Sequence, residues 1–107
     1  MPHTICCALL EYARDHLTAA GRCLTTQAPG LAELHASVDG AMQVTTALAD
    51  LVATLIHQAP AALGHRSDLV LNEFLADLRA MHGCLSTGPL LLAPARDDLH
   101  HLLSSQH

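Results

Sequence analysis

The longest stretch of regular hydrophobic spacing in the chain runs from Leu31 to Ala59, between a Pro29-Gly30 pair and Pro60. At about 100° per residue, its apolar positions gather into one broad stripe. The stripe contains Leu31, Leu34, His35, Val38, Ala41, Met42, Thr45, Leu48, Ala49, Val52, Leu55 and Ile56. We predict one central helix over this stretch, roughly 43 Å long at 1.5 Å per residue.

A second set of apolar residues recurs on the other side of the same stretch, at Val44, Ala47 and Leu51. A helix with two apolar faces needs two sets of neighbours. One set is expected to come from its own chain and the other from a second chain. The alternative is that a C-terminal segment of the same chain covers this second face.

The N-terminal segment from Thr4 to Gln27 has the spacing of an amphipathic helix that ends before Pro29-Gly30. Its apolar face combines Ile5, Leu9, Tyr12, His16, Ala19, Ala20 and Cys23. Because the connection to the central helix is short, the two helices are expected to run antiparallel.

The C-terminal part is predicted to contain a loop from Pro60 to Arg66 and a third helix from Asp68 to Leu85. The apolar face of this helix is predicted to hold Leu71, Phe74, Leu75, Leu78, Met81, His82 and Leu85. Proline and glycine at residues 86–89 are expected to end it. An apolar strip at Leu90–Ala93 would then lie across the bundle or a partner, and a short last helix would begin at Asp97 or Asp98.

Composition agrees with a helical fold, because half of the 107 residues are hydrophobic but only one Phe, one Tyr and no Trp occur. Leu and Ala favour helices, and strand formers are scarce. We therefore predict an all-α protein: a single domain over residues 1–107, folded as an antiparallel helical bundle of three long helices plus a short C-terminal helix.

The net charge and the hydropathy of the chain limit the classes of partner and the location that we expect. Five Arg and no Lys stand against ten acidic residues, for a formal net charge of -5, so a nucleic-acid partner is not expected. No uninterrupted apolar run reaches the 18 residues of a membrane span, and no secretory signal is apparent. A cytoplasmic location is expected, with reduced thiols at Cys6, Cys7, Cys23 and Cys84.

Nine histidines, together with cysteine and methionine, raise the hypothesis of a copper or zinc site. If the helices fold back on one another, His16, Met42 and His82 would form one layer of ligands, and Cys23 with His35 would form another. The alternative is that each histidine lies at the edge of the core and forms a hydrogen bond to a neighbour. No spacing in the chain is diagnostic of a metal site, so we predict no metal or cofactor as resident.

Two smaller clusters of possible metal ligands occur near the ends of the chain, and neither requires a metal to explain it. Pro2 has no amide proton for copper to displace, which makes an N-terminal site with His3, Cys6 and Cys7 defective. Asp97 and His101 are one turn apart, but an acidic first turn also stabilises a helix by itself.

Two pairs of carboxylates are candidates for a general acid and base: Glu11 with Asp15, and Glu73 with Asp77. Each pair shares a helix face that should be solvated, whereas a catalytic pair requires burial. No enzymatic activity is predicted.

The sequence thus favours a small protein-protein interaction module, either a homodimer or the partner of another protein. The predicted interface consists of Val44, Ala47, Leu51, Leu90, Leu91 and Leu92. A soft-metal-binding bundle is the first alternative. The second is a bundle that encloses a small apolar ligand, because a core so poor in aromatic residues can pack imperfectly.

Overall fold

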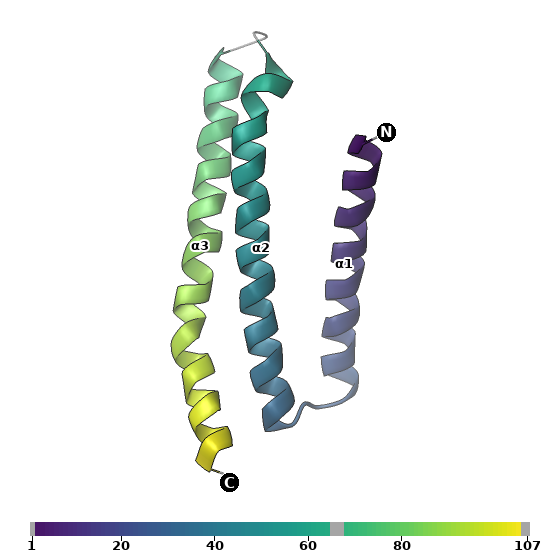
Figure 1. Cartoon of the computed structure of the whole chain (residues 1–107), viewed down its shortest axis with the longest axis vertical. Coiled ribbons are helices and arrows are strands. Elements are labelled where there is room, and N and C mark those ends of the chain that lie inside the picture. Colours follow the sequence, from purple (N-terminus) through teal and green to yellow (C-terminus); the bar gives the residue numbers. More distant parts are fainter. Residues whose placement is uncertain (1, 65–67, 106–107) are drawn as a thin grey trace. The chain divides into compact units, whose positions relative to one another are not determined.

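The computed structural model describes residues 2–64 and 68–105, with side chains from residue 5 onward. Three helices account for nearly all of them: α1 from Pro2 to Thr26, α2 from Leu31 to Leu63 and α3 from Asp68 to Ser105 (Figure 1). No strand occurs within these ranges, which confirms the all-α prediction. The chain divides into two units, Met1–Gly30 and Leu31–His107, and each is described by itself.

Helix α1 agrees with its predicted bounds to within two residues. Its last turn closes through a hydrogen bond from the Gln27 amide to the Cys23 carbonyl, at 3.0 Å. The helix ends just before Pro29, as expected, since a proline disfavours helical geometry in the residue that precedes it. Within their own unit, the large residues of its apolar face are exposed, including Ile5, Leu9 and Tyr12.

Helix α2 is longer than predicted, because it continues through Pro60 to Leu63. A proline inside a helix removes one hydrogen bond and costs about 3 kcal/mol. The helix tolerates that cost because Ala59 is buried and Leu63 is half-buried beyond it. It ends at Gly64, whose φ of 61° suits glycine and whose amide donates to the Pro60 carbonyl at 3.0 Å.

Helix α3 corrects the prediction for the C-terminal part. It is one helix of 38 residues that contains Pro89 and Pro94, so the predicted end at residues 86–89, the separate apolar strip at Leu90–Ala93 and the separate short helix are all wrong. Residues on both sides of the prolines pack towards α2, including Leu85 before them and Leu99 and Leu103 after them. This continued packing explains why the helix does not break.

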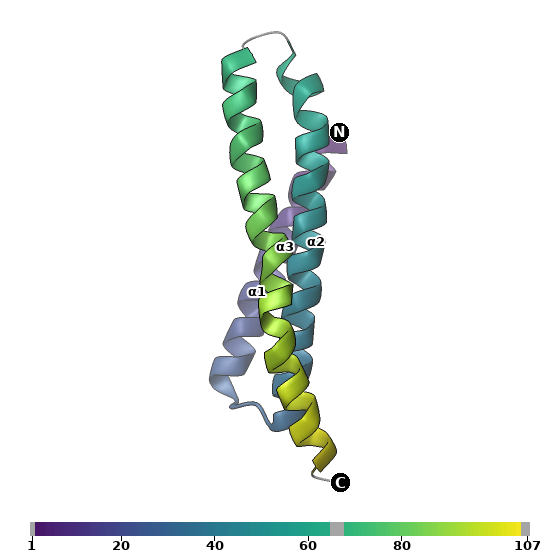
Figure 2. The ribbon, with the colours of Figure 1, turned by 90° about the vertical axis from the view of Figure 1, so that its left-hand side faces the viewer.

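Helices α2 and α3 run side by side in opposite directions and form a helical hairpin (Figures 1 and 2). Asp39 approaches Arg96, and Thr45 approaches Gly88 nearer the turn. Close to the turn, Leu63 and Phe74 line one cavity. Successive residues of α2 therefore lie opposite successively earlier residues of α3.

The contacts of this hairpin follow a heptad repeat, in which core positions a and d alternate at steps of three and four residues. On α2 the buried or half-buried core residues are Leu31, His35, Val38, Met42, Thr45, Ala49, Val52, Ile56, Ala59 and Leu63. On α3 they are Leu71, Leu75, Leu78, His82, Leu85, Pro89, Arg96, Leu99 and Leu103. The hairpin is thus an antiparallel pair with coiled-coil spacing.

The hydrophobic core of the hairpin is small. In the described residues, only five hydrophobic side chains are buried: Met42, Ala49, Val52, Ala59 and Leu75. Two of the five are alanines, and Val52 is the least exposed, at 2%. Two helices alone therefore leave much of their apolar surface in water. The arrangement of all three helices as one bundle, and as one domain, stays a prediction.

Candidate interaction surface

One side of the hairpin carries a continuous row of apolar residues, which we call the apolar flank. These residues occupy heptad position g, directly before the core position a, and in an antiparallel pair the g positions of both helices lie on the same side. On α2 the flank contains Leu34, Ala41, Leu48, Leu55 and Ala62, and on α3 it contains Phe74, Met81, Gly88, Ala95 and Leu102. No charged or polar side chain interrupts it.

The large side chains of the apolar flank are exposed. Leu55, Phe74 and Met81 retain 47%, 45% and 48% of their accessible surface, and Leu34, Leu48 and Leu102 are also exposed. Contiguous apolar surface of this kind usually marks a contact with another protein segment. The flank is therefore the main candidate interaction surface of the hairpin.

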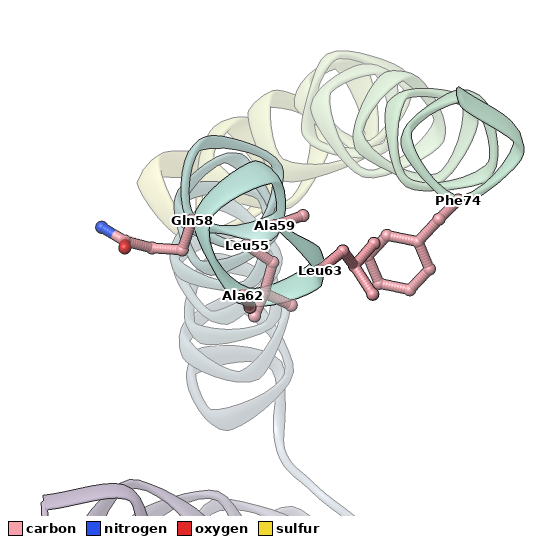
Figure 3. A pocket seen from close by; sticks show the side chains of 6 residues that line it. All are labelled: Leu55, Gln58, Ala59, Ala62, Leu63 and Phe74. Carbon is pink, nitrogen blue, oxygen red and sulfur yellow. The ribbon is translucent and has the colours of Figure 1, made fainter. Parts of the chain in front are cut away.

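A cavity of about 190 Å³ lies in the apolar flank near the turn. Its lining consists of Leu55, Gln58, Ala59, Ala62, Leu63 and Phe74. Figure 3 shows the Phe74 ring from α3 beside Leu63 of α2, with Leu55 and Ala62 next to them, while the amide of Gln58 points away. The lining is thus almost wholly apolar.

The opposite side of the hairpin, the polar flank, has a different chemistry. An ion pair joins Asp39 Oδ1 of α2 to Arg96 Nη1 of α3 at 3.6 Å. Farther from the turn, the rings of His35 and His100 lie 5.9 Å apart between centroids. A second cavity on this side is lined by Asp39, Thr46 and Arg96 among others. The polar and charged side chains of α2 and α3 that approach one another therefore lie on this flank.

The predicted interface residues of α2 are spread around the helix. Val44 and Leu51 occupy position c, which borders the apolar flank, and lie beside Leu48 and Leu55. Val44 is exposed and Leu51 is half-buried. Ala47 occupies position f, on the side of α2 that faces away from α3, and is exposed. Only Val44 and Leu51 thus adjoin the flank.

The three predicted interface leucines of α3 do not form a strip, because they lie within the helix. Leu90 and Leu91 are 73% and 74% exposed. Leu90 occupies position b, whereas Leu91 occupies position c and borders the apolar flank, as Val44 and Leu51 do on α2. Leu92 occupies core position d between Pro89 and Arg96 but is 39% exposed. Helical geometry therefore points these three side chains in different directions.

The ligand layer of the alternative, metal-binding hypothesis is not formed within the hairpin. Met42 and His82 both occupy core positions, but they lie on opposite sides of the level at which Thr45 meets Gly88. Along the hairpin they are about 13 Å apart. A single ion cannot bind both side chains.

The other predicted ligand sets remain without a defined site. In the described residues, no group of three or more His, Cys, Asp or Glu side chains is placed to hold a metal ion. The side chain of His3 lies outside the described residues, whereas Cys6, Cys7, Cys23 and Cys84 are exposed free thiols. Asp97 and His101 are both exposed.

The carboxylates considered for catalysis also lie on outer faces. Glu11, Asp15, Glu73 and Asp77 are all exposed. Among the described residues, no side-chain nitrogen or oxygen atom is both buried and without a hydrogen-bond partner.

The apolar flank is the feature that sequence reasoning missed. Four of its α2 residues, Leu34, Ala41, Leu48 and Leu55, were grouped with the core in one broad stripe, and Phe74 and Met81 of α3 were also assigned to a core face. The signal that separates core from flank is the strict alternation of three- and four-residue steps, which assigns Leu48 and Leu55 to g positions. A stripe drawn at 100° per residue does not resolve this difference.

Within the described ranges, none of the helices combines the length and the apolarity that a membrane crossing requires. No protein-family model matches the chain, and neither a curated protein nor a solved structure matches it. The candidate surface must therefore be interpreted from its own chemistry.

Proposed function

We propose that the chain is a protein-protein interaction module that self-associates into a homodimer through the apolar flank of its helical hairpin. The observation that carries this proposal is the row of exposed apolar side chains from Leu34 to Leu55 on α2 and from Phe74 to Leu102 on α3. Burial of apolar surface is the main driving force of association, at about 25 cal/mol per Å² removed from water.

The small core supports the same proposal. Five buried hydrophobic residues, two of them alanines, are few for a hairpin whose helices have 33 and 38 residues. Helical stability in proteins depends mostly on packing of an apolar face. A cover on the apolar flank would supply the burial that α2 and α3 do not give each other.

Part of that cover is proposed to be α1, in a three-helix antiparallel bundle. Its residues Ile5, Leu9, Tyr12, His16, Ala19 and Cys23 repeat at steps of four and three. This is the same spacing as the core positions of the hairpin, so such a stripe fits between two helices of a left-handed bundle. The four-residue connection from Thr26 to Leu31 favours a return of α1 along α2.

A cytoplasmic location is part of the proposal. The four free and exposed thiols are compatible with a reducing compartment, in which cysteines remain unpaired. A net charge of -5 disfavours nucleic acid as the partner.

The test is native mass spectrometry of the untagged protein, purified without chelator, over a range of concentrations. We expect a dimer for the unchanged chain and a monomer for Leu51→Glu, because the new carboxylate borders the apolar flank. Thr54→Glu is the matched control, since Thr54 is exposed three residues away and faces away from α3. Circular dichroism checks that both variants keep their helices. A monomeric unchanged chain at all concentrations contradicts the proposal.

A further inference from the structure

A pair of histidines bridges the two helices at the end of the hairpin away from the turn. His35 belongs to α2 and His100 to α3, and the centroids of their rings are 5.9 Å apart. His35 occupies core position a and is half-buried, whereas His100 occupies position e on the polar flank and is exposed. Both residues belong to the same compact unit of the chain. The pair is therefore a property of the hairpin itself.

The ring nitrogens of this pair are not engaged by other protein groups. Within residues 2–64 and 68–105, no hydrogen bond or ion pair involves either imidazole. Their ring contacts are with each other and, for His100, with the adjacent His101 at 6.4 Å. A neutral imidazole has one nitrogen that carries a lone pair. Each ring therefore has a lone pair that is available to a ligand.

The distance between the two rings suits a single metal ion. An imidazole nitrogen binds zinc at about 2.0–2.1 Å, which places the centroids of two rings on one ion about 5–6 Å apart. The observed 5.9 Å lies in this range, and the rings are tilted by 41° and not stacked face to face. Because the χ2 torsion of histidine is broad, rotation of each ring can direct a nitrogen to one point between them without movement of either helix.

The charges near the pair do not oppose a cation. One turn nearer the hairpin turn, Asp39 of α2 forms an ion pair with Arg96 of α3 at 3.6 Å. Asp97 approaches the same guanidinium group at 3.7 Å. Two carboxylates thus offset one guanidinium, in a chain whose net charge is -5. Asp39 also accepts a hydrogen bond from the Gln43 amide at 2.8 Å, so it already has two partners and is not counted as a ligand.

We propose that His35 and His100 form a two-histidine site for a divalent transition-metal ion of the zinc and nickel class, which joins α2 to α3 at this end of the hairpin. Imidazole is a preferred ligand of these ions, whereas magnesium and calcium prefer oxygen. Two protein ligands are fewer than the four of a structural zinc centre, in agreement with the absence of a three-ligand group from the described residues. Water completes the coordination. The site lies away from the apolar flank, so this inference goes beyond the proposed homodimer.

Thermal unfolding of the full chain, followed by circular dichroism with and without nickel chloride, tests the site. An ion that binds the folded hairpin should raise the unfolding midpoint by about 5–10 °C at a concentration tenfold above its dissociation constant. Magnesium chloride should not raise it. His35→Gln and His100→Gln should each abolish the rise with nickel, because one imidazole is lost. Glutamine is a good helix former, and the spectra without metal check that each variant keeps its helices.

Two control variants locate the ligands. His57→Gln should keep the full rise, because His57 is exposed on α2 and about 33 Å from His35 along the helix. His101→Gln should also keep it, because adjacent residues of a helix point about 100° apart. The inference is overturned if nickel does not raise the midpoint of the unchanged chain, if the rise survives either His35→Gln or His100→Gln, or if His101→Gln removes it. None of these results depends on the oligomeric state, which native mass spectrometry measures separately.

Discussion

Gly88 of α3 lies against Thr45 of α2, where a Cβ atom added at residue 88 would be 3.6 Å from Thr45 Cγ2. That distance is ordinary van der Waals contact. Gly88→Ala should therefore fit and should raise the free energy of unfolding by about 0.5–1 kcal/mol, because glycine is unfavourable inside a helix. Urea unfolding followed by circular dichroism measures the change. A loss of stability would show that the helices lie closer together at this level.

Gly64 should respond in the opposite way. Its φ of 61° lies in the left-handed region, and its amide caps α2 through the Pro60 carbonyl. Gly64→Ala is expected to lower the free energy of unfolding by about 1 kcal/mol. Gly83→Ala provides the control, because Gly83 is helical and an added Cβ would have no atom beyond its own helical turns within 4 Å among the described residues, so this change should stabilise the protein.

Pro94 tests whether α3 is continuous. It is exposed and lies well inside the helix, where it removes a hydrogen bond to the Leu90 carbonyl. Pro94→Ala should restore that bond and raise the free energy of unfolding by up to about 3 kcal/mol. If α3 were two segments joined by a loop at this point, the same substitution would have little effect on the denaturation midpoint.

The ion pair between Asp39 and Arg96 should contribute little. Both side chains are more than a third exposed, at 39% and 36%, so water and salt screen their attraction. A double-mutant cycle with Asp39→Ala and Arg96→Ala should give a coupling energy of about 0.2–1 kcal/mol. The coupling should fall in 1 M salt. A larger, salt-independent value would mean that the pair is buried by a partner.

Metal content provides a further test. Because Met42 and His82 are on different levels of the hairpin, the paired change His16→Ala and His82→Ala should leave the metal content of the purified protein unchanged. Elemental analysis of protein purified without chelator measures it. A stoichiometric metal that this double variant loses would support the metal-binding alternative and contradict the interaction proposal.

The sequence was sufficient to predict helices because their apolar periodicity is strong in all three. The errors are at prolines. Pro60 and the segment that ends in Pro89 were each expected to end a helix, and Pro94 was expected to lie between helices, but all three lie inside a helix. The rule that proline ends a helix considers only neighbouring residues in the sequence. It does not include the packing of residues on both sides of the proline, such as Leu85 and Leu99, which offsets the lost hydrogen bond.

The predicted interface residues stay a prediction, and their positions relative to the apolar flank differ. Val44 and Leu51 were chosen because they lie off the main stripe, and they do border the apolar flank. Phe74 and Met81 were assigned to the core instead. Their exposure follows from the number of helices that surround them, which the spacing along one helix does not determine.

The heptad pairing of α2 with α3 has a consequence for how such a protein can change in length. Removing seven residues from α2 and the seven opposite them from α3 would return every remaining side chain to the same side of the hairpin, about 10 Å shorter. Removing one residue from α3 would instead rotate all later residues by about 100°, and would turn Leu99 and Leu103 away from α2. Insertions and deletions in this chain are therefore tolerated in whole heptads, matched on the two helices, and not as single residues.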